Sequence, residues 1–488
     1  MVASALLMVY AYLCTPVLGS NVGLTNLTES YGALERVALW QRTFDWLPGA
    51  QAGGRFATWE TWQIAWAARI AFAGMFAAHA WAFWLIWTHR PTRLWPWLIG
   101  PVLTHAVMIL LVPSNADVFF YEMTGDLAAK NINPYVHPLM DFPSNPLLAY
   151  NHWIEMTAVY GPVWTGINAT IMSITGPDPA LATVVYKIVL GIVTLALALL
   201  VGRFVKLLTH RDHLALVGTV LVAWQPNLII ESTGQAHNDP LVLLLCTAGI
   251  MLAVAGGTRA IRGGMVLVTL SVLVKYVTLP ILGLLAMVRL VDRRQKRGFV
   301  GVFGSWVLDG VAILAVMFAA FGPFWSGFDT IKQMLLEPGR LYTNPIWFDP
   351  YMLLDTILPH WVASAWVTIT RVVLQLAAIA LMGFTVIRFI HQMWEIPDHG
   401  RLRTLPPAWT TPLLTGWAII MAVLALLPVN SHPWYWTWPI APIAILLCDS
   451  ARGAEHIGRQ PHVPRWFWGY LLLTALMTLA YHTRIVHI

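Results

Sequence analysis

Apolar runs separated by short polar segments recur along the whole chain. Each run is close to the ~20 residues that a membrane-spanning helix needs, although the shorter runs require their flanking residues. The runs cover residues 2–19, 62–87, 94–112, 181–207, 214–230, 241–255, 299–321, 362–390, 412–427, 434–447 and 466–481. This pattern predicts an all-α polytopic membrane protein with about 11 to 13 transmembrane helices. Residues 2–19 lack a basic beginning, which favours a first membrane helix over a signal peptide.

One further apolar segment, 263–288, is interrupted at Lys275 and Pro280. Arginines precede this segment, and a basic run at 289–297 follows it. Both flanks therefore look cytoplasmic, and an even number of crossings must lie between them. We expect two short helices that meet at Lys275, because short interrupted helices often line a functional cavity.

Composition excludes several classes of protein. Only 11% of the 488 residues are charged and 58% are hydrophobic, with a mean hydropathy of +0.65. Soluble domains average about 25% charged residues, so a soluble, disordered or collagen-like chain is excluded. Most of the 29 lysines and arginines fall on one side of the predicted spans, which places that side in the cytoplasm. The net charge of +6 therefore indicates positive-inside topology and no nucleic-acid partner.

With this orientation the long segments 20–61, 113–180 and 322–361 face outward. Asp117 lies within about one helical turn of the membrane edge, and Tyr121 and Glu122 follow at helical spacing. A carboxylate in this position suits a general base for a hydroxyl nucleophile, and its Asn-Ala-Asp context suits a helix cap equally well. We expect an amphipathic helix on the membrane surface over residues 121–130.

Later in the same outer segment, Tyr160 precedes a Gly-Pro pair and a short apolar stretch at 163–173. A proline at an early position is typical of a helix start, which accounts for Gly161 and Pro162. This interpretation leaves Tyr160 available for function.

Two further polar groups lie at the outer ends of predicted spans. In the turn 231–240, His237 and Asn238 are either solvated turn residues or parts of a site, and Asp239 also suits a helix start. In the turn 430–436, aromatic residues suit either a membrane-interface belt or a site, and His432 favours the site.

Lys275 is the most informative charge, because a lone lysine in an apolar stretch is costly and indicates function by default. A phosphate is one natural partner, since lysine binds phosphate as a compact point charge. The alternative is an ion pair with Asp117, Asp239 or Asp309, or a side chain that snorkels to the membrane surface. Of these, Asp309 is the main candidate for a purely structural partner.

These pieces together resemble the GT-C superfamily of membrane glycosyltransferases, especially bacterial polyprenyl-phosphate-mannose-dependent α-mannosyltransferases. They occur in the family order between Asp117 and Trp436. The matching pieces are Asp117-x3-Tyr121-x3-Gly125, Asn133-Pro134-Tyr135, Tyr160-Gly161-Pro162, His237-Asn238-Asp239, Lys275-Tyr276 and Pro433-Trp434-Tyr435. The aspartate loop usually follows the first helix in that family, whereas here it follows the third.

The resemblance implies an inverting transferase that moves a sugar, expected to be mannose, from a polyprenyl-phosphate donor to a hydroxyl acceptor. Asp117 takes the role of general base, and Lys275, with His432 or His237, holds the lipid phosphate. Substrate contacts are expected from Tyr121, Glu122, Tyr135, Tyr160, Asn238, Asp239, Tyr276, Trp434 and Tyr435. No metal or cofactor is expected, because the Asp-x-Asp motif of oligosaccharyltransferases is absent from the sequence.

The resemblance also places the protein in a bacterial plasma membrane with an outward-facing site and a glycan, glycolipid or other hydroxyl acceptor. Residues 1–93 are interpreted as an N-terminal transmembrane addition with its outer loop. Residues 94–300 form the GT-C-like catalytic module including the outer loop 113–180, and residues 301–488 complete the donor-lipid and acceptor cavity. The alternative function is a transporter or flippase of a lipid-linked or anionic solute, which explains a buried lysine and broken helices equally well.

Overall fold

The computed structural model describes residues 61–110, 113, 117–336, 345–395, 407–428, 430–456 and 461–484. Its named elements are all helices, and the only β feature of this part of the chain is an isolated bridge between Ser326 and Phe328. The predicted all-α class is therefore confirmed. The predicted helix 2–19 and most of the outer loop 20–61 lie outside the described residues.

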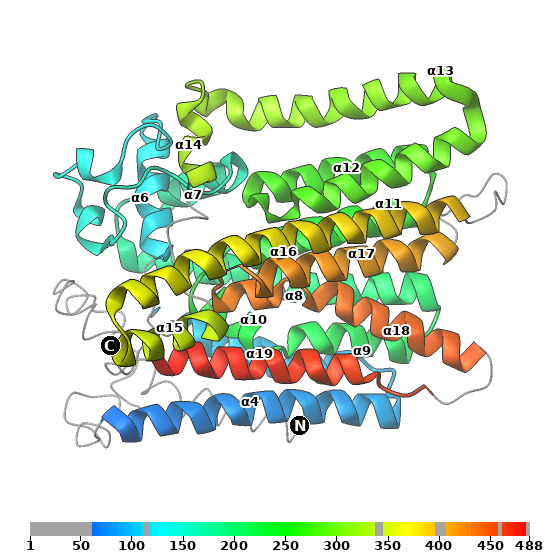
Figure 1. Ribbon diagram of the computed structural model, residues 1–488, viewed down its shortest axis with the longest axis horizontal. Coiled ribbons are helices and arrows are strands. Elements are labelled where there is room, and N and C mark those ends of the chain that lie inside the picture. The colour runs from blue at the N-terminus through cyan, green and yellow to red at the C-terminus, as the bar shows by residue number, and fades with distance from the viewer. Residues whose placement is uncertain are drawn as a thin grey trace.

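Long helices run side by side along the longest axis of the molecule and form a bundle (Figure 1). They follow the apolar runs of the sequence, because a helix satisfies its own backbone hydrogen bonds and leaves its apolar side chains for packing. The bundle contains α4 (Thr61–His89), α8 (Pro179–Thr209), α11 (Asp239–Ala255), α12 (Gly257–Val274), α16 (His360–Glu395), α17 (Pro407–Leu426), α18 (Ile440–His456) and α19 (Arg465–Arg484). Large side chains such as Trp224, Trp417 and Trp436 fill its centre.

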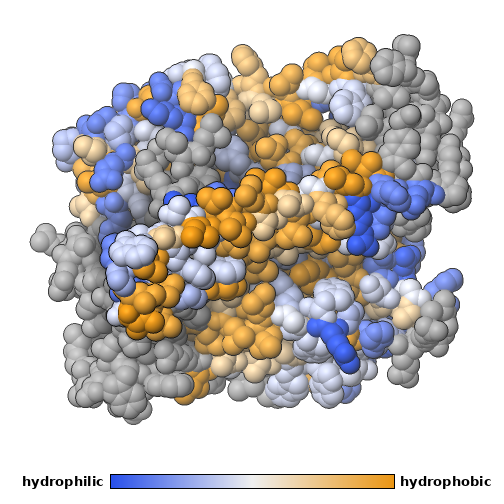
Figure 2. Space-filling view, in the orientation of Figure 1, coloured by the Kyte–Doolittle hydropathy of each residue, from blue (hydrophilic) through white to orange (hydrophobic). Residues whose placement is uncertain are grey.

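Four described helices are long and apolar enough to cross a membrane, and a bent pair brings the number to five. The bent pair joins α9 (Asp212–Ala223) to residues 226–234 at an angle of 53°. Hydrophobic residues form a broad band across the middle of the face shown in Figure 2, with hydrophilic residues toward both ends. The chain is thus a polytopic membrane protein, and the total of about 11 to 13 spans remains a prediction.

The interrupted segment breaks where the sequence predicts. Helix α12 ends at Val274, Lys275 has an extended backbone, and a short turn η5 (Tyr276–Thr278) leads into α13 (Leu279–Phe321). The second half differs from expectation, because the short helix after Lys275 and the span 299–321 belong to one helical element. Its ribbon turns back on itself at the right of Figure 1.

A separate group of short helices covers one end of the bundle, at the left of Figure 1. It contains α6 (Asp117–Ala129), α7 (Pro162–Thr175), η2 (Leu139–Asp141), η3 (Pro146–Tyr150) and α14 (Asp329–Leu336). The helix expected over residues 121–130 begins at Asp117 instead, and residues 118–127 are all buried. It therefore has no exposed polar face of the kind expected for an amphipathic surface helix, because α7, α8 and η3 pack around it.

Candidate active site

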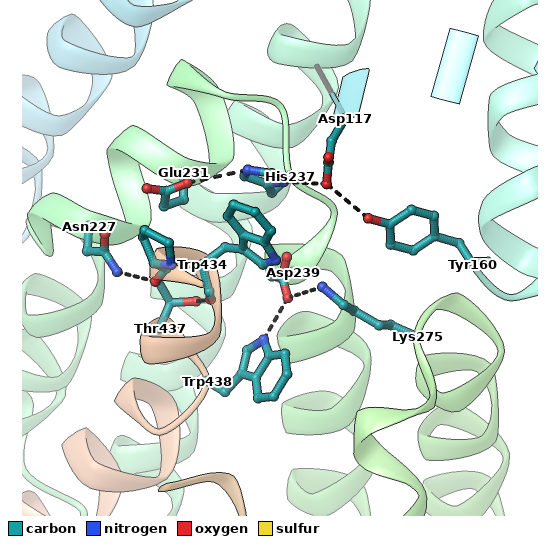
Figure 3. Close-up of polar contacts among 11 residues, drawn as sticks. Asp117, Tyr160, Asn227, Glu231, His237, Asp239, Lys275, Trp434, Thr437 and Trp438 are labelled. Carbon is teal, nitrogen blue, oxygen red and sulfur yellow. Dashed lines mark hydrogen bonds and ion pairs between the residues drawn. The ribbon is translucent and has the colours of Figure 1, made fainter. Parts of the chain in front are cut away.

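Asp117 is the first residue of α6 and faces the end of the bundle. The hydroxyl of Tyr160 donates a hydrogen bond to its Oδ2 atom (3.1 Å), as Figure 3 shows. Burial raises the pKa of Asp117 to about 6, while the Tyr160 hydrogen bond and the charge of Lys275 partly oppose that shift. Burial and the Asp117 carboxylate raise the pKa of Tyr160 far above its ordinary value, so Tyr160 remains a hydroxyl donor.

A close backbone approach fixes the position of Tyr160. The next residue, Gly161, donates its N–H to the carbonyl of Val274 at the end of α12 (3.0 Å). A Cβ atom at position 161 would lie 2.0 Å from the carbonyl oxygen of Leu273, so only glycine fits there. Pro162 then starts α7 at its first position, as predicted.

The predicted neighbours of Asp117 on α6 face in different directions. The ring of Tyr121 packs edge-on against the ring of Tyr160 with 5.1 Å between centroids. Glu122 instead accepts a hydrogen bond from the hydroxyl of Thr183 on α8 (2.7 Å), and burial raises its pKa well above the ordinary value. This hydrogen bond of Glu122 ties α6 to α8 of the bundle.

The turn before α11 carries His237 into the site. It follows α10 (Pro226–Ile229) and a π-helical turn, η4 (Ile230–Gly234), and Ala236 has a positive φ of 62°. The Nδ1 atom of His237 lies 3.6 Å from Asp117 Oδ2, and its Nε2 atom lies 3.4 Å from Glu231 Oε2. His237 and Asn238 are 1% and 0% exposed, so the alternative of solvated turn residues is wrong.

Lys275 forms the ion pair that the sequence left open, and its partner is Asp239. The distance from Lys275 Nζ to Asp239 Oδ1 is 2.9 Å, and the indole N–H of Trp438 donates to the same oxygen (2.6 Å). The expectation that Asp309 is the structural partner is wrong. Asp309 instead binds Arg262 and Arg289, each at 2.6 Å.

Aromatic rings surround the ammonium group of Lys275. Its Nζ atom lies 4.8 Å from the ring centroid of Tyr435, 5.5 Å from that of Trp438 and 5.8 Å from that of Tyr160. Aromatic faces attract a cation, and the effect grows where water is excluded. Tyr160 therefore contacts both Asp117, through its hydroxyl, and Lys275, through its ring.

Trp434 connects the two predicted histidines. Its indole stacks on His237 with 3.8 Å between centroids and on His432 with 4.3 Å. It is only 5% exposed, and Trp436 is 0% exposed, so a membrane-interface belt is the wrong interpretation for both. Burial, and secondarily the charge of Lys275, lower the pKa of His432 to about 3. His432 is consequently neutral at physiological pH.

Tyr135 and Tyr276 support the site from behind Tyr160. The hydroxyl of Tyr135 donates to the carbonyl of Tyr160 (2.9 Å) and shares a hydrogen bond with Thr165 (2.8 Å). Tyr276 packs beside Tyr135. Tyr135 therefore helps to hold Tyr160 in place, and Tyr276 packs against this support.

Sequence reasoning missed two residues of this cluster, Glu231 and Trp438. Glu231 was visible as an acid at the end of an apolar run, six residues before His237 of the histidine–asparagine–aspartate motif. Trp438 carried no signal, because the surrounding turn contains other tryptophans and only packing shows which indole reaches Asp239. Within the described residues, no group of three or more His, Cys, Asp or Glu side chains is arranged to hold a metal ion.

Residues 46–291, just over half of the chain, match the MptA_B family model, described as alpha-(1->6)-mannopyranosyltransferase, N-terminal domain. The chain belongs to the MptA_B family. This membership confirms the predicted resemblance to bacterial mannosyltransferases. All of the clustered side chains from Asp117 to Lys275 lie within the matched region, and the His432–Trp438 segment lies beyond it.

Two relatives of this MptA_B family chain both carry the name alpha-(1->6)-mannopyranosyltransferase A. The Mycobacterium tuberculosis protein is 27% identical over 369 residues, which cover 70% of this chain and 63% of the relative. The Corynebacterium glutamicum protein is 28% identical over 162 residues, which cover 33% of this chain and 32% of the relative. The chain therefore spans less than two thirds of the length of either relative that it matches.

Proposed function

We propose that this protein transfers mannose from a polyprenyl-phosphate donor to a hydroxyl acceptor at the outer face of the membrane. Membership of a mannopyranosyltransferase family supports the sugar and the reaction class. The donor follows from chemistry, because a lipid-linked sugar phosphate can reach a site at the end of a transmembrane bundle from the bilayer. The same membership favours the transferase over a transporter or flippase.

The observation that carries the proposal is that a basic carboxylate, Asp117, and a caged ammonium group, Lys275, both contact the side chain of Tyr160 (Figure 3). The Tyr160 hydroxyl lies 3.1 Å from Asp117 Oδ2, and its ring centroid lies 5.8 Å from Lys275 Nζ. A displacement at an anomeric carbon needs a base on one side and a positive charge near the leaving phosphate on the other. The cluster offers both the base and the positive charge, and each contacts the side chain of Tyr160.

In the proposed step, Asp117 takes the proton of the acceptor hydroxyl as its oxygen attacks the anomeric carbon. The bond from that carbon to the phosphate oxygen breaks, and its electron pair leaves with the polyprenyl phosphate. Attack opposite the leaving phosphate inverts the configuration. A pKa of about 6 suits Asp117 to this task, since a base is most effective when its pKa lies near the working pH.

Lys275 stabilises the negative charge that grows on the departing phosphate. The ion pair with Asp239 and the surrounding rings hold the ammonium group of Lys275 in place before the donor arrives. His432 is neutral, so we assign it at most one donated hydrogen bond to the phosphate and leave the charge to Lys275.

Asn238 is the strongest candidate for recognition of a sugar hydroxyl. It is 0% exposed, and neither its amide nitrogen nor its amide oxygen has a hydrogen-bond partner. Buried polar groups are nearly always paired, so this exception calls for a ligand. A hydroxyl satisfies both amide atoms because it donates and accepts. Trp434 stacks on His237, and the ring of Tyr435 lies 4.8 Å from Lys275 Nζ, so both rings are candidates to pack against the sugar or the prenyl chain.

The deciding experiment measures mannose transfer from synthetic polyprenyl-phosphate-mannose by purified protein in nanodiscs. Replacement of Asp117 by Asn should lower turnover by roughly 10²- to 10⁴-fold, the contribution of a general base, while donor binding persists. Asp141→Asn is the matched control, because Asp141 lies in the same outer segment with a 48% exposed side chain. Normal turnover by Asp117→Asn contradicts the base, and no turnover by the wild type with mannose, glucose or arabinose donors contradicts the function.

A further inference from the structure

His237 is enclosed between two carboxylates. Its Nδ1 atom faces Asp117 Oδ2 at 3.6 Å and its Nε2 atom faces Glu231 Oε2 at 3.4 Å, in a line that Figure 3 shows. A neutral imidazole has one N–H and one lone pair, so one of its nitrogens would face a carboxylate oxygen with a lone pair. Only the doubly protonated ring presents a proton to both carboxylates.

The local backbone supports this arrangement at a cost. Glu231 lies in the π-helical turn η4, a form that occurs often at functional sites. Ala236 adopts a left-handed conformation immediately before His237, which costs about 1 to 3 kcal/mol for a residue other than glycine. The main-chain N–H of His237 then donates to the carbonyl of Glu231 (2.9 Å), which closes the turn. Glu231 and His237 are thus held together by both backbone and side chains.

The ring of His237 is also fixed from its face. Trp434 stacks on it at 3.8 Å with an angle of 27° between the rings. The loop that carries Trp434 is in turn held to α10, because the Asn227 side-chain amide donates to the carbonyl of Pro433 (2.5 Å). Rotation of the imidazole away from the carboxylates therefore requires movement of a second segment.

We propose that Glu231 and His237 are positioning residues for the base: Glu231 holds His237 as an imidazolium, and the imidazolium holds Asp117 ionised and aimed at the acceptor. This inference deepens the proposed function and rests on it. His237 then belongs to the base, whereas the sequence assigned it to the lipid phosphate. An opposite charge within about 4 to 6 Å typically lowers a carboxylate pKa by one to three units, which opposes the effect of burial on Asp117.

Other charges around this contact stay constant in the experiment. Near the cluster are Tyr121, Tyr160, Asp239, Lys275, His432 and Tyr435. On the helices packed against η4, His105 of α5 (Trp95–Leu110) binds the hydroxyl of Thr233 (2.6 Å), and Lys187 of α8 donates to the carbonyl of Met108 (3.0 Å). None of these is altered by His237→Gln, so a shift in the pH profile reports the loss of the imidazolium.

The first measurement is kcat and donor KM from pH 5 to pH 9 for the wild type, His237→Gln and Glu231→Gln. We expect His237→Gln to lower kcat at least tenfold at pH 7, with donor KM changed less than about threefold. The acid limb of its kcat profile should move to higher pH by about one unit or more, because Asp117 loses the imidazolium. The difference in kcat from the wild type should therefore become smaller toward pH 9. Glu231→Gln should move the limb in the same direction and by less, because it also removes the Glu231 charge, which itself raises the pKa of Asp117.

His432→Gln is the matched control, because it removes a histidine from the same tryptophan stack without removing a partner of Asp117. Whatever this variant does to the rate, its acid limb should stay in place. A His237→Gln enzyme with a uniform loss at every pH overturns the proposal and leaves His237 a packing role. An unchanged rate overturns it as well.

A second measurement separates this proposal from the transfer reaction. Histidine-labelled protein is compared by nitrogen NMR with the His237→Gln variant at pH 7.5, and the signal that disappears belongs to His237. A His237 signal of a doubly protonated ring that becomes that of a neutral ring in Glu231→Gln supports the proposal. If the wild type nevertheless transfers no sugar, only the proposed function fails. A neutral signature in the wild type overturns the proposal.

Discussion

At the scale of single residues, Lys275 carries the sharpest test of the phosphate site. Lys275→Met leaves Asp239 buried without its cation, so lost activity alone would fit a structural role. The double variant Lys275→Met/Asp239→Asn removes that unpaired charge. We expect roughly 10²- to 10³-fold slower transfer in both variants, because the phosphate still lacks its positive partner. Transfer assays, with thermal unfolding measured in parallel, distinguish the two roles of Lys275. Recovery of activity in the double variant would assign Lys275 a structural role.

The pH profile of the wild type follows from Asp117. Its pKa is raised to about 6, mainly by burial, and a base acts only when it is deprotonated. The value of kcat/KM should therefore fall about tenfold per pH unit below pH 6 and level off above it. Steady-state assays with saturating acceptor from pH 4.5 to 8.5 measure this limb. A profile that is flat down to pH 4.5 contradicts a pKa near 6 for Asp117 as the base.

The residue scale is also where sequence reasoning reached its limit. It placed Asp117, His237, Asp239, Lys275 and His432 in one site, and side-chain contacts through Tyr160 and Trp434 connect all five. It favoured Asp309 as the structural partner of Lys275, whereas Lys275 pairs with Asp239. That choice depends on how α11, α12 and α13 rotate against one another, which packing of distant segments determines.

At the scale of elements, the junction of α7 and α12 holds the base and the cation in register. Gly161→Ala would push its Cβ against the Leu273 carbonyl and move Tyr160 away from Asp117. We expect a loss of about 1 to 3 kcal/mol of stability, seen as a lower Tm, together with reduced kcat. Gly166→Ala is the control, because Gly166 lies on the same helix, α7, and its added Cβ would meet no other atom within 4 Å. An active, stable Gly161→Ala enzyme would contradict this account of the junction.

The two arms of α13 meet through a buried ion cluster. Residues 289 and 309 would lie about 30 Å apart along a straight helix, yet Arg289 Nε is 2.6 Å from Asp309 Oδ2. Arg262 of α12 binds the other oxygen at 2.6 Å, so one carboxylate joins three helical segments. The apolar pattern of the sequence predicted the spans but not this contact, because hydropathy does not show which helix segments pack against each other.

Replacement of Asp309 by Ala leaves the fully buried Arg289 without its carboxylate. Breaking a buried pair on one side costs about 3 to 5 kcal/mol, so the Tm in detergent should fall clearly. Asp329→Asn, on the exposed surface of α14, should leave Tm unchanged. A Tm for Asp309→Ala equal to that of the wild type would show that other contacts hold the two arms.

At the scale of the whole molecule, the polar chemistry gathers at one end of the bundle and basic side chains gather at the other. The site lies where α11 begins, α12 ends and α6 covers the helix ends. At the opposite end, Glu455 of α18 contacts Arg90 (3.1 Å), which directly follows α4, and Arg211 (3.9 Å), which directly precedes α9. The positive-inside rule assigns that second end to the cytoplasm, so the site is expected outside.

Cysteine labelling in intact cells tests this orientation. Asp141→Cys places a thiol beside the site, where the native side chain is 48% exposed, and Asp212→Cys places one at the opposite end, where it is 65% exposed. The native Cys246 and Cys448 are buried, and Cys14→Ser removes the remaining thiol from the background. A membrane-impermeant maleimide should label position 141 in intact cells and label position 212 only after lysis.

Both substitutions replace exposed side chains, so the variants should still fold, and transfer activity in membranes verifies this. The reverse pattern would place the base and the caged lysine in the cytoplasm, where a nucleotide sugar rather than a lipid-linked one would be the available donor.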